Sequence, residues 1–359
     1  MILNSQQYQK IQGLCVDSLK TRVKELQDFL SANDELSQFD QLAASTLEKV
    51  DGSVFHHFFV VDSLEQYYEI ENLLIELQED DEVVEDIQSF WLAGRYSAKY
   101  FEYLKEFDDF DLAMIELFKR FQSDLTIIVE SLIWEKAWPE NFELIDLGVF
   151  QTDRLSRDSS VITSIKLVSQ DKDNFDSHFE KMEKALKIIK ESSPLCFEAL
   201  ECFSHTIIPI NEPGIVSYSS QSIPGISCIN FYERNFVDLI DDLVHENGHH
   251  HLNAYLNHTE LIYEDDEKIF YSPWRRTERA IRGIYHAAGT FIWAYLLFKD
   301  LSKDLRLFDR EQSEYINKRL NEERTMLLES KDQISRAKDL NKISKSGSIL
   351  IEDLLQFVD

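Results

Sequence analysis

Residues 236–251 read FVDLIDDLVHENGHHH, and this stretch decides how the rest of the chain is interpreted. Its apolar residues Phe236, Ile240 and Leu243 recur at steps of four and three, which is the spacing of the buried face of an α-helix. We therefore expect a helix over about residues 235–257 whose apolar stripe is buried.

The same stretch contains a candidate metal site of the pattern HExxH. His245 and His249 stand four residues apart, so on a helix both imidazoles project to one side and can bind one metal ion. Glu246 points about 100° away from them, which suits a base or an orienting group rather than a ligand. His250 and His251 lie around the back of the helix, and we interpret them as structural.

The rest of the sequence shows two different residue patterns, one typical of helices and one typical of short strands. Helical spacing dominates from residue 5 to about 137, including one long predicted helix over 109–137, whereas short β-branched runs appear after Pro139. We expect strands near 145–151, 161–168, 206–210, 215–219 and 226–232, and further helices near 174–191, 277–301 and 309–340 with a short one at the C-terminus. The predicted fold class is mainly α with α+β character: a helical N-terminal region (1–138), then an α+β metal-binding domain (139–359) with a small sheet.

Composition and charge exclude several classes of protein. The chain has 10 Gly and 6 Pro among 359 residues, well below the average usage of about 12%, which argues against a turn-rich β-sandwich or barrel. A net charge of −29 repels phosphate backbones and anionic membranes, so we expect neither nucleic acid nor membrane as a partner. The N-terminus lacks the pattern of an export signal, and the four cysteines lack C-x-x-C spacing, so we expect free thiols in a cytoplasmic protein.

A second candidate region is the stretch SPWRRTERAIRGIYH at residues 272–286, which carries four arginines in a very acidic chain. On a helix, Arg275, Arg279, Arg282 and His286 would form one stripe. With His286 as a third metal ligand, Arg282 and Arg279 would lie about 6 and 10 Å along the helix axis from it. The stripe therefore predicts a guanidinium that holds the far carboxylate of a metal-chelating dicarboxylate.

At these residues the chain resembles the HExxH-type, 2-oxoglutarate-dependent peptide β-hydroxylases. The pattern of that family follows HExxH with S-P-x-R, R-P-L and G-x-L-H. The corresponding segments here are Ser272-Pro273 with Arg275, then Arg279-Ala280-Ile281, and Gly283-Ile284-Tyr285-His286. Ala280, Ile281 and Tyr285 depart from the pattern without removing a charged or ligating group. The resemblance covers about residues 205–300.

The resemblance implies an Fe(II) enzyme that uses 2-oxoglutarate and O2 to hydroxylate a β-carbon of a peptide or protein substrate. It implies that His245, His249 and His286 hold the iron, although a carboxylate in place of His286 stays open. It also implies that Arg279, or else Arg275, binds the far carboxylate of the co-substrate with Ser272 nearby, and that Glu246 orients a ligand or a water.

Two other functions remain open from the residues alone. In a zinc metallopeptidase, Glu246 would be the general base for a metal-bound water, and a downstream glutamate would be the third ligand. The available glutamates are Glu260, Glu264, Glu267 and Glu278. Alternatively, the chain is a helical interaction protein with a vestigial metal site, whose acidic N-terminal half docks a partner.

Overall fold

The computed structural model describes residues 5–32, 36–50, 151–155, 160–161, 163–169, 171–220, 223–257, 259–263 and 267–358, together with isolated positions between 61 and 72. The helix predicted over 109–137, most of the strand predicted over 145–151 and the domain boundary predicted at 138/139 lie outside these residues and stay predictions.

The chain divides into two compact units. One comprises Met1–Cys15 and Thr152–Asp359, and the other comprises Val16–Gln151. Helix α1 (Ser5–Ser31) begins in the first unit and continues in the second, where α2 (Gln38–Leu47) starts at a capping box. Tyr8 on α1 belongs to the core of the first unit, because its ring contacts Phe203, His251 and Trp293. The sequence did not indicate that the first turns of the chain join the unit that carries HExxH.

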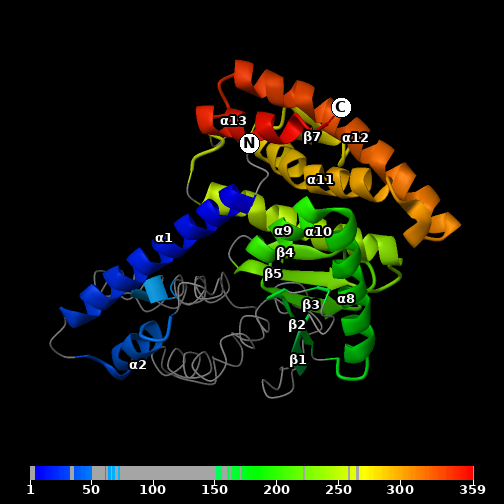
Figure 1. Ribbon diagram of the computed structural model, residues 1–359. Helices are drawn as coiled ribbons and strands as arrows, with labels where there is room; N and C mark the ends of the chain where they lie inside the picture. Colours follow the sequence, from blue (N-terminus) through cyan, green and yellow to red (C-terminus); the bar gives the residue numbers. More distant parts are fainter. Residues whose placement is uncertain are drawn as a thin grey trace. The chain divides into compact units, whose positions relative to one another are not determined.

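A small mixed sheet lies in the first unit, as Figure 1 shows. Its strand order is β1-β2-β3-β5-β4, with β3 parallel to β2 and β5 and with β4 antiparallel to β5. The strands span Gln151–Arg154 (β1), Lys166–Ser169 (β2), Thr206–Ile210 (β3), Tyr218–Ser220 (β4) and Ile223–Asn230 (β5). All five residues of β3 are buried, which explains its continuous apolar sequence. Strands β2 and β4 begin later than the runs predicted for them.

Helices cover this sheet in successive layers, so that α10 lies between the sheet and α11, and α12 packs on α11 (Figure 1). The helices span Phe175–Ser192 (α8), Pro194–Phe203 (α9), Phe236–Leu256 (α10), Ile281–Leu301 (α11), Arg310–Asp339 (α12) and Lys345–Leu355 (α13), with a short 3-10 helix at Leu305–Leu307. The predicted fold class, mainly α with a small sheet, is confirmed. Helix α9 was not expected from the sequence; it begins with a proline at its first turn.

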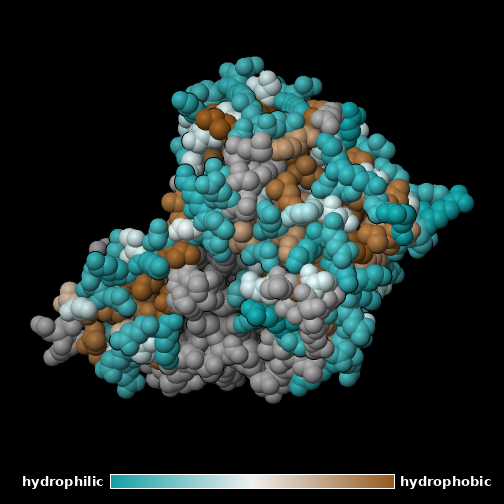
Figure 2. Space-filling model, viewed as in Figure 1, coloured by the Kyte–Doolittle hydropathy of each residue, from teal (hydrophilic) through white to brown (hydrophobic). Residues whose placement is uncertain are grey.

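The exposed surface of the C-terminal helices is mainly polar. Hydrophilic residues cover most of the visible surface of α12 and α13 (Figure 2). Within the described part of the chain, every helix is too short or too polar to span a bilayer. All four cysteines are free thiols, as predicted.

Helix α10 begins where the sequence predicts because Asn235 and Asp238 form a capping box. Its residue Gly248 packs closely against α11. A Cβ atom at Gly248 would lie 2.8 Å from Cδ1 of Trp293 and 3.1 Å from the carbonyl oxygen of Thr290. The HExxH helix is therefore packed directly against the helix that carries His286.

We expect Gly248→Ala to destabilise the protein by about 1–3 kcal/mol, because the added methyl group must displace the buried indole or the backbone of α11. Urea unfolding followed by circular dichroism measures this change. Gly13→Ala is a matched control, since a Cβ there meets nothing within 4 Å. The control is expected to stabilise α1 by about 0.5–1 kcal/mol. Equal stability of Gly248→Ala and the unmodified protein would contradict this account of the helix contact.

The arginine stretch differs from its prediction. Residues Phe270–Ser272 (β6) pair antiparallel with Thr277–Arg279 (β7), and α11 begins only at Ile281. Arg276 has a left-handed φ of 53°, and Ala280 is extended, so a continuous helix cannot pass through them.

The prediction of one helical stripe through Arg275, Arg279, Arg282 and His286 is therefore wrong. Only Arg282 and His286 share a helix, whereas Arg279 lies on a strand and Arg275 in the hairpin loop. The physical reason is that pairing with β6 satisfies the backbone of β7, which local helical spacing does not reveal.

Candidate metal centre

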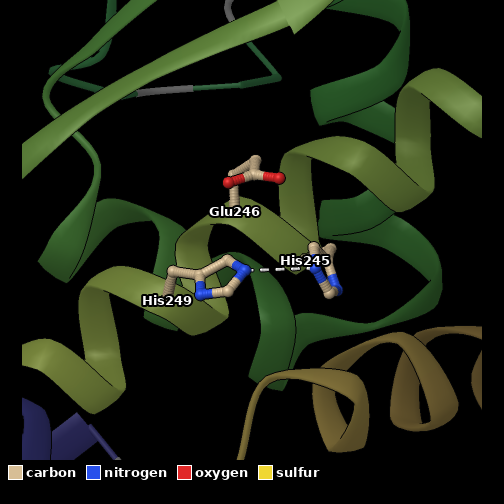
Figure 3. A group of neighbouring side chains, drawn as sticks. All are labelled: His245, Glu246 and His249. Atoms are coloured by element: carbon tan, nitrogen blue, oxygen red, sulfur yellow. Dashed lines mark hydrogen bonds between the residues drawn. The ribbon is translucent and has the colours of Figure 1, made fainter. Parts of the chain in front are cut away.

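Two histidines of α10 form the centre of the site. The Nε2 atoms of His245 and His249 lie 3.2 Å apart, and Figure 3 shows the two rings turned toward each other from successive turns of the helix. Two imidazole nitrogens bound at about 2.1 Å to one tetrahedral or octahedral ion are separated by about 3.0–3.4 Å. The pair is therefore spaced to bind a single ion.

Burial keeps both imidazoles neutral. Desolvation lowers the pKa of His245 to about 4, with Arg319 and His286 adding to the effect. Desolvation likewise lowers the pKa of His249 to about 2, with His245 and His286 adding to it. A neutral imidazole is the form that binds a metal, so at neutral pH protons do not compete for these nitrogens.

Glu246 projects from α10 in a different direction from the two histidines, toward β4 (Figure 3). Its carboxylate accepts a hydrogen bond of 2.7 Å from the Ser219 hydroxyl, and burial raises its pKa to about 8. The ligand atoms of His245, Glu246 and His249 all lie within 4.8 Å of one another, so the carboxyl group is close to the pair. Because it is held by β4, Glu246 is placed to orient the helix and its histidines.

His286 reaches the same place from α11. Its ring lies beside His249 with the ring centroids 4.8 Å apart, while its Nε2 lies 3.4 Å from Oδ1 of Asn253. Burial lowers its pKa to about 4, with Arg282 and Arg279 adding to the effect. The structure thus places the ring of the third predicted histidine beside His249, but its Nε2 is directed at an amide oxygen, and the ligand atoms that lie within 4.8 Å of one another belong to His245, Glu246 and His249.

The three histidines open into a pocket of about 810 Å³ between α10, the β6–β7 hairpin, α11 and α12. A pocket of this size suits a small ligand together with a substrate side chain. It contains every predicted site residue except Glu246: His245, His249, Ser272, Arg275, Arg279 and His286. Ser272 is buried, and its hydroxyl accepts a hydrogen bond of 3.4 Å from the backbone N–H of Arg275, so it shapes the hairpin loop.

Arg279 occupies an electrostatically unusual position at the wall of this pocket. A Cβ atom at Gly283 would lie 3.1 Å from Cζ of Arg279, so the guanidinium rests on the first turn of α11. The N-cap residue of that helix, Ala280, has no side chain to accept from the free backbone N–H groups. A cation at the positive end of an uncapped helix is repelled, and an anion bound between them relieves that repulsion.

Among the pocket residues that were not expected from the sequence, four form one network: Trp274, Phe291, Arg319 and Glu323. Trp274 stacks on Phe291 with their ring centroids 4.9 Å apart, and Phe291 packs against His245. The Trp274 indole donates a hydrogen bond of 3.2 Å to Glu323, which also lies 2.9 Å from Arg319. This network fastens the hairpin to α12, but its members are up to 49 residues apart, so no local pattern reveals it.

A zinc peptidase would need a glutamate as its third metal ligand, and Glu323 is the glutamate that lines the pocket. Of the four glutamates considered from the sequence, Glu264 lies outside the described residues and the other three do not line the pocket. Glu323 does line it, and burial raises its pKa to about 7. Its two oxygens already face Trp274 and Arg319.

No protein-family model matches this chain, and no curated protein matches it.

Proposed function

We propose that this protein is a non-haem Fe(II)/2-oxoglutarate-dependent dioxygenase that hydroxylates a side-chain β-carbon of a peptide or protein substrate. The observation that carries the proposal is one pocket that holds both a neutral histidine pair and, at the uncapped start of α11, the Arg279 guanidinium. A metal site and an anion site in one pocket suit a ligand that chelates the metal with one carboxylate and extends a second one away from it.

Each residue has a distinct part in this proposal. His245 and His249 would hold Fe(II), and His286 is the candidate for the third position. The bound ion, with its co-substrate, would supply the activation of O2. Neutral imidazoles leave the 2+ charge of the ion uncompensated, which favours an anionic bidentate co-substrate. Arg279, with Arg275 as second choice, would bind the far carboxylate through paired N–H donors.

The four free thiols support the predicted cytoplasmic location, because cytoplasmic cysteines stay reduced.

The direct test is an anaerobic titration of the protein with Fe(II) and 2-oxoglutarate. A visible charge-transfer band is expected when both are present, and His245→Ala should abolish it. Tight zinc binding with no such band would count against the dioxygenase.

A zinc metallopeptidase is the second candidate function, favoured by the raised pKa of Glu246 and by the presence of Glu323 in the pocket. Against it stands the hydrogen bond that holds Glu246 on Ser219, away from the pocket lining. A general base must reach the water that it deprotonates.

Glu246→Gln separates the two functions. We expect the variant to keep the Fe(II)/2-oxoglutarate band at an intensity close to that of the unmodified protein, because a glutamine oxygen still accepts the Ser219 hydrogen bond. The zinc-loaded proteins, variant and unmodified, are expected to leave a mixed peptide library intact in mass spectrometry. Cleavage by the unmodified zinc protein that is lost in Glu246→Gln would establish the peptidase instead.

A further inference from the structure

Residues 272–282, which run from the end of β6 through the hairpin loop and β7 into the start of α11, form a basic surface that we call the arginine hairpin. Its four arginines are all exposed: Arg275, Arg276, Arg279 and Arg282. This cluster of positive charge contrasts with the net charge of −29 of the whole chain. The co-substrate carboxylate proposed at Arg279 would account for one of these cations, and Arg275 and Arg276 remain as exposed charges beside it.

Three of the four arginines of this surface have no ion pair with a described carboxylate, whereas several arginines elsewhere in the same unit have one. Arg234, Arg306, Arg310 and Arg319 each pair with a carboxylate at 2.6–2.8 Å. In contrast, no carboxylate among the described residues forms an ion pair with Arg275, Arg276 or Arg279. Within the arginine hairpin one carboxylate, the exposed Glu278 of β7, stands against four arginines, so the segment keeps a net positive charge that is complementary to an external anion.

The hairpin also has an open edge. Strand β7 pairs with β6 on one side, no other described strand pairs with it, and all three of its residues are exposed. An open edge accepts an extended peptide through backbone hydrogen bonds. Arg279 and Ala280, at the end of β7, line the pocket that contains the histidines. A peptide that follows β7 is therefore led to the mouth of the pocket.

We propose that the arginine hairpin is the docking surface for an acidic, extended segment of the peptide substrate. The inference rests on the proposed function, since it takes the ligand to be the peptide whose side chain enters the pocket. The long-range repulsion between an acidic peptide and this acidic protein is screened at physiological ionic strength, where the Debye length is about 8 Å. The arginines then act at contact distance, and their placement selects acidic sequences.

The test measures peptide binding without metal or co-substrate, so it does not depend on catalysis. Fluorescein-labelled peptides of alternating Asp and Ser, Lys and Ser, or Gln and Ser are titrated with the protein at about 0.15 M salt. We expect the Asp peptide to bind and the other two to bind at least about tenfold more weakly, because exposed charge pairs each contribute modestly and several act together. Equal binding of the Gln peptide would overturn the proposal.

Charge-reversal variants locate the surface. Arg275→Glu/Arg276→Glu is expected to weaken the Asp peptide about tenfold or more, because two attractions become two repulsions. The control Lys303→Glu/Arg310→Glu makes the same change in net charge at exposed positions outside the pocket and is expected to leave binding unchanged. If the two double variants weaken peptide binding equally, the affinity depends only on the net charge of the protein and not on the arginine hairpin, and the proposal is overturned. Retained Co(II) binding in both variants shows that the histidine site is intact. A loss of peptide binding therefore tests the docking surface alone and leaves the proposed metal site unaffected.

Hydrogen exchange tests the extended docking mode. The amides of residues 277–279 are expected to gain protection when the Asp peptide is added and not when the Lys peptide is added. Protection confined to other segments would overturn the β7 assignment. Tighter binding of a single-stranded oligonucleotide than of the Asp peptide would also overturn the proposal, since it would identify the surface as a nucleic-acid site.

Discussion

His249→Ala is expected to weaken the binding of Fe(II), or of Co(II) as its spectroscopic substitute, by more than about 100-fold. The reason is that His245 and His249 supply the paired nitrogens 3.2 Å apart, and one imidazole alone cannot hold the ion. Loss of an outer partner of a metal ligand typically costs 10- to 100-fold, so loss of a ligand itself should exceed that range. Isothermal titration under anaerobic conditions measures the change.

Thermal unfolding gives a second measurement of the same site. An ion present at about 100 times its Kd stabilises the folded state by about 2.7 kcal/mol, and this stabilisation should vanish in His249→Ala. His205→Ala is the matched control, because His205 is a half-buried histidine of the same unit that does not line the pocket. If His249→Ala binds Co(II) as tightly as the control does, the pair is not the metal site.

The second large effect concerns the co-substrate. Arg279→Gln is expected to weaken 2-oxoglutarate binding to the Fe(II) protein by about 30-fold or more, because a charge-assisted bidentate pair is lost in a partly enclosed site. Arg279→Lys should restore the charge but not the paired geometry, and so recover only part of the affinity. The charge-transfer band, titrated with 2-oxoglutarate at fixed Fe(II), measures both.

Gly283→Ala tests the position of the guanidinium without removing it. An added methyl group would lie 3.1 Å from Cζ of Arg279, so the arginine must shift away from the start of α11. We expect weaker 2-oxoglutarate binding with unchanged Co(II) affinity. If Arg279→Gln and Gly283→Ala both bind 2-oxoglutarate normally while Arg275→Gln does not, Arg275 is the carboxylate-binding residue. If none of the three variants changes binding, the anion site lies elsewhere.

Much of the fold was predictable because the relevant signals are local. The apolar stripe that begins at Phe236 and the capping residue Asn235 define α10, and the two histidines then share one face by helical geometry alone. The run at 206–210, rich in β-branched residues, similarly predicts a strand, and the structure places it in the middle of the sheet. The scarcity of glycine and proline correctly indicated a mainly helical protein.

The site was less predictable where strands and distant segments decide it. The spacing of Arg275, Arg279 and Arg282 also fits a helix, and only the pairing of β7 with β6 shows that the first two lie on a hairpin. Trp274 and Glu323 meet across 49 residues of sequence. Such contacts depend on how α12 packs on α11, which no periodicity in either segment encodes.

The sequence by itself determined the residue types, the helix that carries His245 and His249, and the mainly α fold class, because each follows from spacing along one segment. The tertiary structure alone decided that His286, the arginine hairpin and Glu323 line the same pocket as that pair, and that Glu246 is turned to Ser219 instead. The physical reason is that helix spacing is fixed by hydrogen bonds a few residues apart. The pocket, in contrast, is assembled by side-chain packing between elements far apart in the chain.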